Sequence, residues 1–198
     1  SFLSSVETNA STLKRMRDGR KHVEEFVRGN SVALVGGAPF MPSEGLPAPI
    51  AKANGADIVG HLNVFRLSSI PALLRNSYRV DFMVHALSET EAVGGPYETI
   101  EFTGGSPFFL SPYPYGIRRE TGSFRTKTGN QRNVENYFAK NNLPIWVPAL
   151  DEYLGLESQL KSTRPNSGFA AIRWLLSMDV ESLFVTGFTF FKGGYEKS

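Results

Sequence analysis

The sequence predicts an α/β domain with a Rossmann-like parallel sheet and helices on both faces of that sheet. Short apolar stretches rich in β-branched and aromatic residues recur along the chain, and stretches with helical periodicity separate most of them. Alternating strands and helices favour parallel strands that are joined by crossover helices. The 198 residues, 41% of them hydrophobic, can bury one sizeable core, so we expect a single domain over residues 1–198.

The composition excludes several classes of protein. The net charge is +2, which is too small to predict a nucleic-acid partner from bulk electrostatics. The sequence contains no cysteine, so it can form neither a disulfide framework nor a thiolate metal site. It also contains no secretory segment and no apolar run of membrane-spanning length. We therefore expect a cytoplasmic protein with no transmembrane segment.

The first expected element is an amphipathic surface helix over residues 13–27, in which Gly19 is a weak point. A second expected helix, over residues 69–76, has Pro71 in its first turn, where a proline is tolerated. The other expected helices are 48–53, 133–140 and the run after Pro165. The five expected strands are 31–36, 57–63, 80–86, 144–149 and 182–188.

Two stretches between these elements have the composition of loops. Residues 88–116 are rich in glycine, proline and aromatic residues, which predicts irregular binding surface apart from a short strand at 99–103. The aromatic rings there could stack on a sugar or base, or could simply pack the loop down. Residues 117–132 carry five basic residues and one acidic residue, which predicts either a loop that closes over an anionic ligand or an ordinary solvated loop.

The first expected strand ends in Gly36 and Gly37. Nucleotides bind at the carboxyl end of the first strand in many doubly wound sheets, and glycines would allow close approach of the backbone to a ligand. The second strand would bring Asn63 to the same edge, where its amide could hydrogen-bond a sugar or base, or could stabilise a turn. Arg66 follows as a phosphate ligand or a surface cation.

His85 lies near the carboxyl end of the third expected strand. It is the candidate for acid–base catalysis or phosphate contact, and the alternative is a hydrogen-bonded structural histidine.

The stretch Pro165-Asn166-Ser167-Gly168 leads into an apolar run of helical periodicity and then into the last expected strand. Asn166 or Ser167 can cap this helix, whose first backbone N–H groups have no intrahelical acceptor. Those N–H groups could bind a phosphate or carboxylate, and Gly168 would let the ligand approach the backbone. The alternative is a capped core helix without a ligand.

Both glycine-containing segments resemble the L and S sialylmotifs of the sialyltransferases, glycosyltransferase family 29, with a looser similarity to the bacterial family 42 enzymes. The first match is Ala33-Leu-Val-Gly-Gly-Ala38, followed by Asp57-Ile-Val-Gly-His-Leu-Asn63. The second match runs from Pro165-Asn-Ser-Gly168 to Val185-Thr-Gly-Phe188. The order and spacing of the motifs are specific, whereas residues 67–160 have no matched motif.

The resemblance implies a variant GT-A-like glycosyltransferase fold and an inverting transfer from a CMP-activated donor. The transferred sugar would be a sialic acid or a Kdo-like acidic sugar, and the acceptor a glycan or glycolipid. A CMP leaving group can depart without a metal when hydrogen-bond donors stabilise it, so we expect no metal and no cofactor. The donor-binding residues that the resemblance implies are Gly36, Gly37, Asn63, Asn166, Ser167 and Gly168.

Two departures from the family pattern affect the expected chemistry. Gly37 stands where the family has an asparagine that contacts the donor. The family's catalytic histidine lies in a motif downstream of the S motif, and none of His22, His61 and His85 occupies that position. The base would then lie in a segment beyond Ser198, be a different residue, or be absent. The lack of cysteine differs from animal members and favours a microbial or viral relative.

Two other functions stay open at this stage. A non-enzymatic nucleotide-sugar or glycan-binding module would keep the donor site and lack a base. A methyltransferase that uses S-adenosylmethionine can also place a ligand beside a strand that ends in two glycines. It predicts an acidic residue at the end of the second strand, where this sequence has Asn63.

Overall fold

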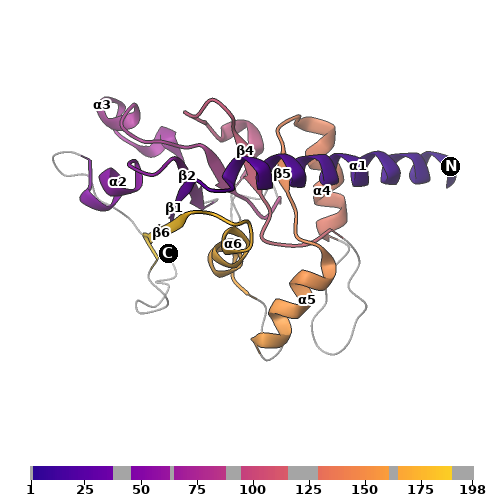
Figure 1. Cartoon of the computed structure of the whole chain (residues 1–198). Helices are drawn as coiled ribbons and strands as arrows, with labels where there is room; N and C mark the ends of the chain where they lie inside the picture. The colour runs from indigo at the N-terminus through magenta and orange to yellow at the C-terminus, as the bar shows by residue number, and fades with distance from the viewer. Residues whose placement is uncertain are drawn as a thin grey trace, which may run out of the picture.

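The computed structural model describes residues 2–37, 46–62, 65–87, 95–115, 129–160 and 165–188, which contain a six-stranded sheet (Figure 1). Neighbouring strands are all parallel, in the order β5-β4-β3-β2-β1-β6. The strands are β1 (Ser31–Val35), β2 (Ile58–Leu62), β3 (Phe82–Val84), β4 (Phe108–Leu110), β5 (Ile145–Trp146) and β6 (Ser182–Thr186). The predicted Rossmann-like α/β fold is confirmed.

Helices cover both faces of the sheet because successive side chains of each strand point to opposite faces. On one face, Val32 and Leu34 of β1 pack with buried residues of α1 (Phe2–Val27), α5 (Leu150–Gln159) and α6 (Ser167–Leu176). On the other face, Ala33 and Val35 pack with α2 (Ala48–Ala53), and Met83 of β3 packs with α4 (Gly129–Lys140). The short elements are η1 (Leu67–Ser69), α3 (Ala72–Arg75) and η3 (Tyr97–Thr99).

The long helix α1 packs against β5, the strand at one edge of the sheet, and extends beyond it toward the N-terminus (Figure 1). At Gly19 the two backbones are so close that an added Cβ would overlap the Ile145 carbonyl oxygen. Arg15, one turn earlier, donates hydrogen bonds to the carbonyl oxygens of Phe138 (2.7 Å) and Asn141 (2.9 Å) at the end of α4. The helix therefore continues through Gly19, and the missing side chain allows its contact with β5.

Arg20 connects α1 to α5, the helix that follows β5 along the chain. Its guanidinium donates two hydrogen bonds, of 2.7 and 2.8 Å, to the Glu152 carboxylate in the first turn of α5. Arg20 also lies over the ring of Trp146, 4.8 Å from its centroid, and Trp146 Nε1–H donates to Glu24 at 3.0 Å. The hydrogen bond from Arg20 lowers the pKa of Glu152 below its usual value. α1, β5 and α5 thus share one network of charged and aromatic side chains.

Several element predictions are wrong in detail. The expected strand at 99–103 is absent from the described structure, and β4 forms instead within the segment that was expected to be irregular. β4 exists through its neighbours: the His85 N–H donates to the Leu110 carbonyl oxygen (3.0 Å), and the Phe109 N–H donates to that of Pro144 (2.9 Å). Local composition does not encode these long-range bonds.

The remaining differences concern the length and number of helices. The expected strand 144–149 is reduced to β5, and α5 follows it where no helix was predicted. The expected helix 69–76 is divided into η1 and α3, and Pro71 is the N-cap of α3 rather than part of its first turn. α4 begins at Gly129, earlier than the predicted residue 133.

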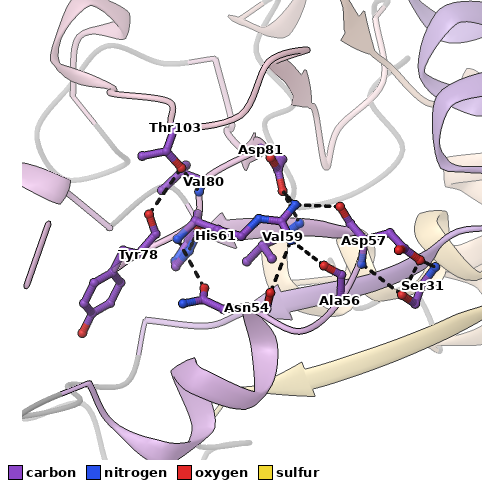
Figure 2. A network of polar contacts seen from close by, with 11 residues as sticks. Ser31, Asn54, Ala56, Asp57, Val59, His61, Tyr78, Val80, Asp81 and Thr103 are labelled. Atoms are coloured by element: carbon purple, nitrogen blue, oxygen red, sulfur yellow. Dashed lines mark hydrogen bonds and ion pairs between the residues drawn. The ribbon is translucent and has the colours of Figure 1, made fainter. Parts of the chain in front are cut away.

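A polar network joins the starts of three strands at the amino-terminal edge of the sheet (Figure 2). The Asp57 carboxylate accepts hydrogen bonds from the backbone N–H (2.8 Å) and hydroxyl (2.6 Å) of Ser31. The Arg79 guanidinium donates to the carbonyl oxygens of Ala56 (2.6 Å) and Asp57 (2.7 Å) and to the Asp81 carboxylate (2.9 Å). The hydrogen bonds from Ser31 lower the pKa of the Asp57 carboxyl. This network holds together the amino-terminal ends of β1, β2 and β3.

Candidate functional site

The strand order of the sheet reverses between β1 and β6. From β1 the chain adds β2, β3, β4 and β5 in succession on one side, and then returns to place β6 on the other side of β1. In open α/β sheets, ligands bind outside the carboxyl ends of the strands at such a reversal. The expected site segments meet here, since Gly36 directly follows β1 and α6 directly precedes β6 along the chain.

Gly36 is tied to the end of β6. Its N–H donates to the Thr186 carbonyl oxygen at 2.7 Å, and the residue is buried. A Cβ at this position would overlap the backbone of Gly187 and lie 2.9 Å from Cδ2 of Phe188. The space at the Cβ position of Gly36 is therefore occupied by protein, and its expected contact with a donor stays a prediction. Gly37 is exposed, so it is the member of the glycine pair that a ligand can approach.

The start of α6 has one capped and two uncapped N–H groups in the described structure. Asn166 is the N-cap, and its side-chain oxygen accepts a hydrogen bond from the Phe169 N–H at 2.8 Å. Among the described residues, no group accepts a hydrogen bond from the N–H of Ser167 or of Gly168. These two donors stand at the positive end of the helix dipole, where an anion is stabilised.

Gly168 also lies close to the ring of Phe188. A Cβ at Gly168 would overlap the edge of the Phe188 ring and lie 3.2 Å from its Cδ1 atom. Phe188 therefore occupies the Cβ side of Gly168, and the expected approach of a ligand to this glycine stays a prediction. Its N–H group is not involved in that contact and keeps its predicted role.

Tyr113 is a site residue that sequence reasoning did not single out. It follows β4, and its hydroxyl lies 3.3 Å from the Ser167 hydroxyl at the start of α6. Buried Ser111 fixes the turn by donating its hydroxyl to the Tyr113 carbonyl oxygen (2.8 Å). Trp174 of α6 donates to the Pro112 carbonyl oxygen at 3.2 Å. The polar aromatic composition of residues 111–115 was the available signal, but nothing in the sequence pairs it with α6.

His85, the catalytic candidate, is buried at the end of β3. Its Nδ1 accepts a hydrogen bond from the Leu87 N–H at 2.9 Å, and its ring contacts the rings of Tyr97 and Phe109. Leu87 has a left-handed backbone, with φ of 59°, which this bond helps to hold. These contacts agree with the structural alternative for His85, because its Nδ1 is engaged in the hydrogen bond from Leu87.

His61 is also buried, on β2, with its ring stacked on Phe65 at a centroid distance of 4.0 Å. Its Nε2–H donates to the Arg79 carbonyl oxygen at 2.9 Å, and burial lowers the pKa of His61 to about 4. His22 lies exposed on α1. Asn63 and the basic segment 117–128 are outside the described residues, so their predicted roles remain predictions.

Comparison of the chain with models of protein families, with curated proteins and with solved structures finds no match. Within the described ranges, no helix has the length and apolar character needed to cross a membrane. No group of three or more histidine and acidic side chains suited to a metal ion is found in the same part of the chain.

Proposed function

We propose that this chain is a sialyltransferase-like glycosyltransferase that binds a CMP-activated acidic sugar at the carboxyl edge of β1 and β6. The observation that carries the proposal is the meeting of the two segments that resemble the sialylmotifs, at the strand-order reversal. Gly36 and Gly168 are far apart in sequence, yet a Cβ added at either would lie within 2.9 Å of an atom of the Phe188 ring. The two segments that resemble the sialylmotifs therefore lie next to each other in the fold.

The polar groups of this place suit a donor with a phosphate and a carboxylate. The N–H groups of Ser167 and Gly168 are hydrogen-bond donors, and so is whichever hydroxyl of the Ser167–Tyr113 pair does not donate to the other. None of these groups carries a negative charge. In the proposed reaction an acceptor hydroxyl attacks the anomeric carbon and loses its proton to a base, and the bond from that carbon to the CMP phosphate oxygen breaks. Negative charge grows on the departing phosphate, and these donors would stabilise it.

A nucleotide-sugar-binding module without transferase activity is the second candidate. It is favoured by the state of the histidines near the sheet, since His61 and His85 are both buried and each uses a ring nitrogen in a structural hydrogen bond. Both candidates require the same donor site. They differ in turnover, which would be measured as release of CMP from CMP-sialic acid in the presence of a glycan acceptor.

Calorimetric titration with CMP tests the shared site, with AMP and S-adenosylmethionine as competing ligands. We expect CMP to bind in preference to both, and Ser167→Ala to weaken its affinity about tenfold, the equivalent of one good hydrogen bond. Ser177→Ala is the matched control, because Ser177 lies at the other end of α6 and its hydroxyl donates to the Trp174 carbonyl oxygen. Preference for the adenosine ligands, or equal effects of the two serine changes, would reject the proposal.

A further inference from the structure

Phe188 lies beside two glycines. An added Cβ at Gly36 would overlap the Gly187 backbone and lie 2.9 Å from Cδ2 of the Phe188 ring, whereas one at Gly168 would overlap Cε1 of that ring and lie 3.2 Å from its Cδ1. The two glycines thus meet different edges of one ring. We call Gly36, Gly168, Gly187 and Phe188 the Phe188 cluster. It joins the end of β1, the start of α6 and the end of β6.

The backbone before Phe188 determines where the ring lies. Thr186, the last residue of β6, accepts a hydrogen bond from the Gly36 N–H at 2.7 Å. Gly187 then adopts a φ of 74°, in the left-handed region that residues other than glycine rarely enter. The chain turns at this residue and brings the Phe188 ring between the two glycine positions. The ring is therefore placed by a hydrogen bond and a glycine turn, and not by loose surface packing.

We propose that Phe188 is a positioning residue that holds the uncapped N–H groups of Ser167 and Gly168 at a fixed place relative to the end of β1. The inference rests on the proposed donor site, but it concerns the geometry of the site and assigns no ligand contact to the ring. The ring needs the space beside Gly168, whereas at Gly36 the Gly187 backbone and the ring both need it. Binding groups are effective when they are held within about 0.5 Å of their productive positions, and close packing on rigid elements supplies that precision.

The alternative is that Phe188 only adds buried apolar area, in which case any apolar residue would serve. Phe184 provides the matched comparison. It belongs to β6, the strand that precedes Phe188, and is also partly buried, but its ring faces α2, where the Lys52 ammonium lies 4.6 Å from its centroid. Phe184→Leu removes a ring from β6 without touching Gly36 or Gly168, whereas Phe188→Leu removes the ring between them.

The first measurement is the backbone amide NMR spectrum of each variant without ligand. We expect Phe188→Leu to shift the signals of Gly36, Ser167 and Gly168 together by more than the lost ring current accounts for, and Phe184→Leu to leave these three signals at their wild-type positions. Both spectra are recorded under conditions where the variant is folded. If the two changes shift the three signals equally, the positioning role is overturned. This measurement does not depend on whether the protein binds CMP.

The second measurement is CMP affinity with a compensating substitution. We expect Phe188→Leu to weaken binding about tenfold and Phe184→Leu to change it less than about twofold. Gly168→Ala should abolish binding because the methyl group would overlap the ring, and the double variant Gly168→Ala/Phe188→Leu should recover part of the affinity. Failure of the double variant to improve on Gly168→Ala would contradict the inference.

Different results would reject the proposed function and the positioning role of Phe188. If wild-type protein does not bind CMP, the proposed function is rejected, and the amide shifts still decide whether Phe188 positions the three segments. If CMP binds and Phe188→Leu behaves like Phe184→Leu in both measurements, the donor site stands and the positioning role is rejected.

Discussion

The His61 ring lies on the sheet face covered by α2, stacked on Phe65. Its Nε2–H donates to the Arg79 carbonyl oxygen, and its Nδ1 is buried without a hydrogen-bond partner among the described residues. Because burial disfavours the charged imidazolium, the pKa of His61 falls to about 4 in the folded chain, compared with 6.5 as its ordinary value. His61 is therefore neutral in the folded protein at neutral pH.

This pKa difference predicts a loss of stability in acid. Below pH 6.5 the unfolded chain binds a proton at His61 and the folded chain does not, so the free energy of unfolding falls as the pH decreases from 6.5 to about 4. The full effect is about 3 kcal/mol, since one pKa unit corresponds to 1.36 kcal/mol. Urea unfolding at several pH values would measure it.

His61→Gln keeps an N–H donor and does not titrate, so its stability should decrease less than that of the wild type over this pH range. His22→Gln, a change at an exposed position on α1, should follow the wild-type curve. A wild-type curve parallel to that of His61→Gln would show that the buried histidine does not control the acid response.

The glycines show what the sequence could and could not reveal at the scale of single residues. The L-like and S-like segments identify Gly36 and Gly168 as special, and the structure brings both to the strand-order reversal. Their expected reason was a ligand, and the structure places the Gly187 backbone and the Phe188 ring at the Cβ position of Gly36 and the Phe188 ring at that of Gly168. A glycine in a sequence indicates that another group lies close to its Cα. The sequence does not indicate whether that group is a ligand or another part of the chain.

At the scale of elements, the contact between α1 and β5 predicts an unusual effect of an alanine. Alanine favours a helix interior over glycine by about 1 kcal/mol. At Gly19, however, the new methyl group would overlap the Ile145 carbonyl oxygen, a backbone atom that cannot rotate away. We expect Gly19→Ala to lower the free energy of unfolding by about 1–3 kcal/mol, as overpacking does in other cores.

Gly155, inside α5, is the matched control. A Cβ there would have no neighbour within 4 Å, so Gly155→Ala should raise the free energy of unfolding by about 0.5–1 kcal/mol. Chemical denaturation of the two variants gives opposite signs if α1 packs on β5 as described. Stabilisation by both changes would contradict the close approach at Gly19.

Elements with a strong local pattern could be predicted, and elements made by pairing could not. The buried runs of β1 and β2 and the capped apolar run of α6 were expected near their observed positions. β4 was missed because Phe108–Leu110 lies among glycines and prolines, and its strand geometry comes from the hydrogen bonds to its neighbours β3 and β5. The role of Tyr113 was missed for the same reason, since its contact with Ser167 spans 54 residues.

At the scale of the whole molecule, the two edges of the sheet differ in chemistry. The amino-terminal edge is closed by the network of Ser31, Asp57, Arg79 and Asp81, in which charged groups are paired (Figure 2). The carboxyl edge keeps exposed Gly37 and the uncapped N–H groups of α6. Parallel strands place all their starts on one edge and all their ends on the other, so stability and ligand binding can be changed separately.

Arg79→Met and Ser167→Ala test this separation directly. Arg79 donates to two carbonyl oxygens within 2.7 Å as well as to Asp81, and its loss would leave those acceptors without the charged donor. We expect Arg79→Met to lower the free energy of unfolding by about 2 kcal/mol, with the partly exposed ion pair to Asp81 contributing little of it. CMP affinity of the folded variant should stay at the wild-type value.

Ser167→Ala should do the reverse, with weaker CMP binding and an unfolding midpoint in urea close to that of the wild type. If Arg79→Met weakened CMP binding as much as Ser167→Ala does, the two edges would be coupled through the sheet, and donor binding could not be assigned to the carboxyl edge alone.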